Sequence, residues 1–86
     1  MSRRELRQYV KDRDAAFLSL DLKKIRAFAD KYGCELPDNE EVMWIMIHKV
    51  ICNITSATKE QRNNSLMWLF LHGYSPDIFA GREALK

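Results

Sequence analysis

The sequence predicts an all-α fold, a compact four-helix bundle with an apolar third helix at its centre and a short C-terminal extension. Apolar residues recur at intervals of three and four, which is the helical period, and do not alternate as they do in strands. The 86 residues include only three Gly and two Pro, too few for a fold with many tight turns. Start and stop signals separate four helical stretches. We therefore expect a single helical domain, 1–86.

The first two helices are expected at residues 2–18 and 21–32. In the first helix the apolar residues recur at helical spacing, and Arg13 occupies one position of that pattern at which an apolar residue is expected. Asp21 provides an N-cap for the second helix and Gly33 its C-terminal stop. The link from Ser19 to Asp21 leaves open whether the two helices are separate or form one bent rod.

The third and fourth helices are expected at residues 39–53 and 58–72, followed by a tail over 75–86. Asp38 with Glu41 three positions later forms a helix-start signal, and Thr58 with Gln61 forms a capping box. Gly73 provides the stop for the fourth helix.

The third helix is apolar around its whole circumference, because every residue from Val42 to Ile47 is apolar. A helix of this kind lies in the middle of a bundle. Ile47→Ala and Ile51→Ala are therefore expected among the most destabilising substitutions.

The fourth helix repeats this pattern at Leu66–Leu71, which is more apolar surface than two other helices can cover. If Leu66, Leu69 and Phe70 face the core, then Trp68 and Leu71 point elsewhere. Either the tail with Ile78 and Phe79 covers them or a second chain does. Exposed aromatic and aliphatic side chains on a small domain indicate an interaction surface. The expected partner-binding residues are Trp68, Leu71 and Tyr74.

The composition, with 47% hydrophobic and 30% charged residues, is typical of a soluble globular protein, and the lack of a secretory signal predicts a cytoplasmic location. No apolar run approaches the roughly 18 residues of a membrane span, and no apolar segment follows the N-terminal charges as in a secretory signal. We therefore expect no membrane association, and Cys34 and Cys52 as free thiols.

No constellation predicts catalysis, a cofactor or a metal. His48, Cys52, Cys34 and His72 include the residue types of a zinc site, but structural zinc sites take ligands in close pairs from turns, and the only close pair here is helical. A thiolate at Cys52 is disfavoured within an apolar helix. The three glycines stand apart, so no phosphate-binding loop is present. The chain is not expected to be an enzyme.

The net charge of +2 is unevenly distributed: basic residues predominate through Lys31 and acidic ones in residues 32–57. A basic helical face can follow a phosphate backbone. The alternative function is thus a small nucleic-acid-binding regulator that uses its basic N-terminal helices or the start of the fourth helix. The candidate basic face comprises Arg4, Arg7, Lys11, Lys24 and Lys31.

Residues 40–75 carry His48-Lys49, then Arg62, Ser65, Trp68-Leu69 and His72-Gly73-Tyr74. This arrangement resembles small uncharacterised helical proteins from phage and mobile-element regions of Firmicutes. The resemblance implies a non-enzymatic protein-interaction module that binds and inhibits a host protein, such as a defence nuclease, as anti-CRISPR proteins do. The expected partner is a host or phage protein or a second copy of the chain.

Overall fold

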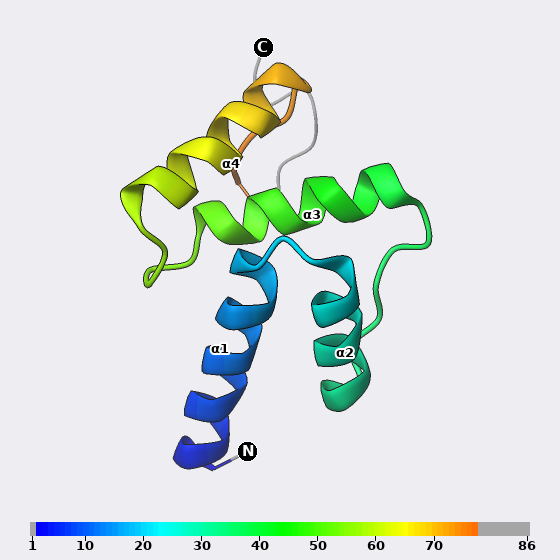
Figure 1. Cartoon of the computed structure of the whole chain (residues 1–86), viewed down its shortest axis with the longest axis vertical. Coiled ribbons are helices and arrows are strands. Elements are labelled where there is room, and N and C mark those ends of the chain that lie inside the picture. The colour runs from blue at the N-terminus through cyan, green and yellow to red at the C-terminus, as the bar shows by residue number, and fades with distance from the viewer. Residues whose placement is uncertain (1, 78–86) are drawn as a thin grey trace. The chain divides into compact units, whose positions relative to one another are not determined.

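The computed structural model describes residues 2–77, and four α-helices lie in this part of the chain (Figure 1). They are α1 (Arg3–Leu18), α2 (Leu22–Tyr32), α3 (Glu40–Cys52) and α4 (Lys59–Leu71). Residues 2–77 contain no strand, and the predicted all-α class with four helices is confirmed. The chain divides into two compact units at the boundary between Leu36 and Pro37. One unit holds α1 and α2 and the other holds α3 and α4; the expectation of a single domain stays a prediction.

Side-chain caps fix where the helices begin. The Thr58 hydroxyl accepts a hydrogen bond from the Gln61 amide at 3.1 Å, and the Gln61 side chain accepts one from the Thr58 amide at 2.8 Å, so the predicted capping box is confirmed. For α3 the cap is Asn39 and not Asp38: the Asn39 side-chain oxygen accepts from the Val42 amide at 3.2 Å. Asp and Asn cap helices equally well. Because Asp38 and Asn39 are adjacent, the sequence leaves the first residue of α3 ambiguous by one position.

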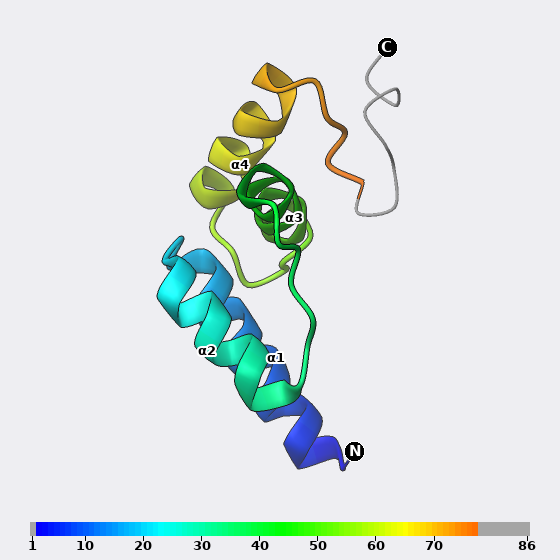
Figure 2. The ribbon, with the colours of Figure 1, turned by 90° about the vertical axis from the view of Figure 1, so that its right-hand side faces the viewer.

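In the first unit α1 and α2 are separate helices that pack side by side in antiparallel directions (Figure 2). The turn between them places Leu20 at φ 56°, in a left-handed conformation that ends α1. Asp21 then caps α2, accepting a hydrogen bond from the Lys23 amide, and Gly33 ends it at φ 66°, both as predicted.

An aromatic cluster joins α1 to α2. Tyr9 of α1 contacts Phe28 and Tyr32 of α2, and Phe17 of α1 contacts Phe28, with ring centroids 5.0–6.0 Å apart in tilted or edge-to-face geometry. Such pairs add about 0.5–1.5 kcal/mol each to the burial of apolar area. The aromatic cluster thus holds the two helices in register.

In the second unit α4 packs against α3. The buried apolar residues of this unit are Met43, Ile47, Ile51, Ile54, Ala57 and Leu69. The apolar circumference of α3 is largely covered, apart from Val42 in its first turn, which is exposed. Ile78 and Phe79, the predicted cover for α4, lie outside the described residues.

Candidate functional site

Four large apolar side chains of α4 are open to solvent. The exposed fractions are 44% for Leu66, 58% for Met67, 67% for Phe70 and 73% for Leu71. We call these four residues the α4 patch. Single exposed apolar residues are ordinary, whereas a contiguous group on one helix of a small protein is a candidate contact surface.

The α4 patch lies on the side of the helix opposite α3. Phe70 follows Leu66 by four residues and Met67 by three, so these three side chains lie on one stripe along the helix. Ser65 and Leu69, four apart on the other side, are buried. Of the three residues considered for the core side of this helix, Leu69 is buried as expected. Leu66 and Phe70 are exposed, so their placement in the core was wrong. Because the polar Ser65 occupies the side of α4 that faces α3, the larger apolar side chains lie on the outer side of α4.

A shallow groove runs along this stripe, lined by Asn63, Leu66, Met67, Phe70 and Tyr74. Tyr74 is brought beside α4 because the chain reverses at Gly73, with φ 80°, and the Tyr74 amide donates to the Leu69 carbonyl at 2.9 Å. From Asn63 to Pro76 the sequence contains no Asp, Glu, Lys or Arg. The groove is therefore apolar and lies in a stretch without acidic or strongly basic side chains.

Four rings form a second feature, which we call the ring cluster: Trp44 and His48 of α3, Trp68 of α4, and His72, which directly follows α4. The His48 imidazole stacks on the Trp68 indole with centroids 4.4 Å apart, and His72 stacks on the same indole at 3.8 Å. Trp44 contacts His48 at 6.0 Å. The ring cluster therefore fastens α4 to α3 on the side away from the α4 patch.

Hydrogen bonds fix both imidazoles. His48 is buried and its Nδ1 lies 2.9 Å from the Ser65 hydroxyl. His72 Nδ1 lies 2.7 Å from the Trp68 carbonyl oxygen, to which it donates. Burial lowers the pKa of His48, and the nearby His72 lowers it further. His48 is thus held neutral as a structural ring.

The predicted partner-binding residues occupy different places. Leu71 belongs to the α4 patch and Tyr74 lines the groove, whereas Trp68 is half-buried in the ring cluster. Their role in partner binding stays a prediction. Sequence reasoning missed Leu66, Met67 and Phe70 as surface residues, since a helix apolar on all sides gives no period from which to choose its outer face.

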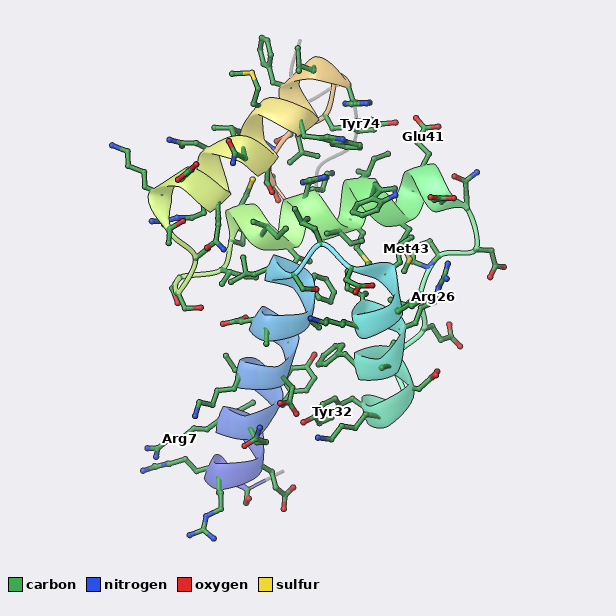
Figure 3. All side chains as sticks on the ribbon, in the orientation of Figure 1. Arg7, Arg26, Tyr32, Glu41, Met43 and Tyr74 are labelled. Atoms are coloured by element: carbon green, nitrogen blue, oxygen red, sulfur yellow. The ribbon has the colours of Figure 1, made fainter. Side chains whose placement is uncertain are left out.

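The N-terminal half of α1 carries an arc of cations. Arg3, Arg4, Arg7 and Lys11 are exposed and form no ion pair with the described residues. At 100° per residue they span about a quarter of the circumference, while Glu5 and Asp12 lie on the other side. Arg7 points away from α2 (Figure 3). We call these four residues the basic arc.

The other two predicted basic-face residues differ in their surroundings. Lys24 is exposed on α2. The Lys31 ammonium lies 3.0 Å from an Asp12 carboxylate oxygen and 5.3 Å from the centroid of the Tyr32 ring. The charge of Lys31 is thus balanced within the first unit.

Asp12 is the acceptor of a network across α1 and α2. The Tyr32 hydroxyl donates to it at 2.6 Å, Lys31 at 3.0 Å and the Gln8 amide at 2.9 Å. These hydrogen bonds, with that from Tyr32 the strongest, lower the pKa of Asp12 to about 2. Figure 3 shows Tyr32 between the two helices. The network thus compensates the charge of Asp12 and links α1 to α2.

Replacing Tyr32 with phenylalanine is expected to raise the pKa of Asp12 toward about 3.9, the value of a free aspartate. Since the folded pKa lies below the unfolded one, the network stabilises the fold above roughly pH 4 and loses this effect as the pH falls toward 2. Titration of the Asp12 carboxyl carbon by NMR measures the change. Lys24→Gln is the control, because it removes a cation from α2 without touching Asp12; an unchanged Asp12 midpoint in Tyr32→Phe contradicts the assignment.

No group of three or more His, Cys, Asp or Glu side chains within residues 2–77 is arranged to hold a metal ion. Both histidines of the hypothetical zinc set are engaged in the ring cluster. Cys52 donates a weak hydrogen bond from Sγ to the Arg62 carbonyl at 3.8 Å, and burial raises the pKa of its thiol. Both cysteines are free thiols, as predicted.

Among residues 2–77, no helix has the length and apolar character needed to cross a bilayer. No protein-family model, no curated protein and no solved structure matches the chain.

Proposed function

We propose that this protein is a non-enzymatic protein-interaction module whose main contact surface is the α4 patch. The single observation that carries the proposal is the exposure of four large apolar side chains on one helix, beside a groove without formal charge. A few side chains supply most of the binding energy in a protein interface, and aromatic residues and methionine are enriched there. Leu71 and Tyr74 keep the role predicted from the sequence, together with Leu66, Met67 and Phe70.

The resemblance to small phage and mobile-element proteins supplies the proposed biological setting. In that setting the module acts in the cytoplasm and inhibits a host protein, such as a defence nuclease, by occupying one of its surfaces. Inhibition by occupation requires a compact body with an exposed contact surface and needs no catalytic group. This requirement agrees with a small helical chain whose two histidines stack in the ring cluster and whose two thiols donate weak hydrogen bonds to backbone carbonyls.

The test uses bacteria that carry an active defence nuclease and a plasmid that the nuclease targets. Expression of the protein is expected to restore recovery of the plasmid, and Phe70→Glu is expected to abolish the effect because it places a carboxylate in the α4 patch. Ala27→Glu is the matched control, since it places one carboxylate at an exposed helical position of α2, outside the α4 patch. Absence of protection across a panel of nucleases contradicts the inhibitor role.

A second candidate function, binding of nucleic acid, is favoured by the basic arc. Four cations without an ion pair among the described residues lie on adjacent positions of one exposed helix face, which suits contact with successive phosphates. The start of α4, with exposed Lys59 and Arg62, is the other predicted phosphate-binding segment. Phosphate contacts of this kind give affinity without sequence specificity.

Salt titration of binding to random duplex DNA tests this candidate. If all four cations contact phosphates, a plot of the logarithm of the binding constant against the logarithm of the salt concentration has a slope of about −3.6. Each contact that is removed reduces the magnitude of this slope by about 0.9. Arg7→Gln is the test variant, and Lys23→Gln, which removes an exposed cation of α2, is the control. No complex at low salt, or equal slopes for the two variants, excludes the basic arc as a phosphate-binding surface.

A further inference from the structure

We infer that the α4 patch of the free protein is covered by a second copy of the chain, in a two-fold dimer whose α4 helices pack antiparallel. The inference rests on the proposed function in using the same contact surface, and it names the partner that occupies it. Three properties of the described residues carry it: the size of the α4 patch, the charge of its surroundings and the order of its side chains.

The size of the α4 patch suits a dimer. From their exposed fractions, the four side chains present about 500 Å² of surface, near the upper end of apolar patches on monomeric proteins. Two copies packed face to face remove roughly 1,000 Å² from water, which reaches the lower bound for a specific interface. Side chains flanking the stripe add to this area. A micromolar dissociation constant is therefore expected.

The charges around the α4 patch permit two identical surfaces to meet. An isologous interface brings each surface against its own copy, so any charge at its centre meets a like charge. From Asn63 to Pro76 there is no acidic residue, lysine or arginine, and Lys59, Glu60 and Arg62 lie beyond one end of this stretch. A charged partner surface would find no complement here, whereas a second copy meets no repulsion at the centre.

The order of the side chains selects the antiparallel arrangement. The groove runs from Asn63 through Leu66 and Met67 to Phe70 and Tyr74, so its apolar middle is bordered by a residue with a polar group at each end. An antiparallel pairing centred near residue 68 sets Phe70 against Leu66 and Met67 of the partner, and Asn63 near Tyr74. Antiparallel packing also opposes the two helix dipoles favourably.

Sedimentation equilibrium of the full chain tests the dimer. Between about 1 and 300 µM the mass is expected to rise from 10.1 kDa toward twice that value, since a micromolar dissociation constant lies inside this range. Phe70→Glu is expected to stay monomeric, while Ala27→Glu, with its new carboxylate on α2, dimerises like the parent. Phe70 is an exposed side chain on the side of α4 away from α3, so the helical circular dichroism of Phe70→Glu should match the parent.

A charge-exchange experiment tests the antiparallel geometry. Phe70→Glu and Leu66→Lys are each expected to be monomeric, and their equimolar mixture is expected to recover the dimer mass. In the antiparallel pair the new carboxylate of one chain meets the new ammonium of the other, and the second contact remains Leu66 against Phe70. In a parallel pair each of these two positions would face the same position of the partner, so the new carboxylate and the new ammonium would not meet and no rescue would occur.

The outcomes separate this inference from the proposed function. A parent mass of 10.1 kDa at every concentration overturns the dimer. Mass growth without a limit also overturns it, because a closed two-fold pair cannot extend. The plasmid-protection assay is scored independently: protection that depends on Phe70 in a protein of monomeric mass leaves the proposed function standing while the dimer fails.

Discussion

Ile47→Ala is expected to destabilise the protein by about 3 kcal/mol, within the 2–5 kcal/mol range for truncating a buried isoleucine. Ile47 has 0% exposure on α3, so the removed carbons leave a cavity that the packed surroundings fill only in part. A change of this size lowers the thermal midpoint by roughly 12–24 °C in a domain of this length. Thermal unfolding followed by far-UV circular dichroism measures it.

Val42→Ala provides the control on the same helix. Val42 is exposed, and alanine has the better helix propensity, so this substitution is expected to change the free energy of unfolding by less than about 0.5 kcal/mol. Equal losses in the two variants would show that the centre of α3 is not tightly packed.

Acidification is expected to weaken the protein through His48. The pKa of this imidazole is lowered in the folded state by burial and by His72, so the unfolded chain binds a proton near pH 6.5 while the folded protein does not. The free energy of unfolding is therefore undiminished by His48 above about pH 6.5. It falls by up to about 1.4 kcal/mol per pH unit between that pH and the lower pKa of the folded state.

His48→Gln isolates this effect. Glutamine retains a side chain able to bond Ser65 but does not titrate, so the loss of stability between pH 7.5 and 5.5 should be smaller in the variant, although the variant is less stable at every pH. Urea unfolding at a series of pH values measures both proteins. An NMR titration of His48 with a midpoint above 6.5 would contradict this prediction, because acidification would then stabilise the folded protein.

The extent of the helices was predictable because their ends are determined by local chemistry. The Asp21 cap, the Gly33 stop and the Thr58–Gln61 capping box each act within a few residues. The break between α1 and α2 was not predictable, since it depends on Leu20 in a left-handed conformation that leucine seldom adopts.

The arrangement around α4 was less predictable, because it depends on contacts between helices. Trp68 was expected at a partner surface, but His48 comes from a different helix and offers it an aromatic partner 4.4 Å away. The buried Ser65, bonded to that same imidazole, then determines which side of α4 faces α3. Phe70 is exposed as a consequence of this pairing.

The ring cluster has a practical consequence for following the unfolding of each unit. Both tryptophans of the chain, Trp44 and Trp68, belong to it, and the α1–α2 unit has none. Indole emission therefore reports on one helix pair alone, whereas the peptide signal at 222 nm averages all four helices. Coincident curves from these two optical probes would indicate that both halves melt as a single cooperative system.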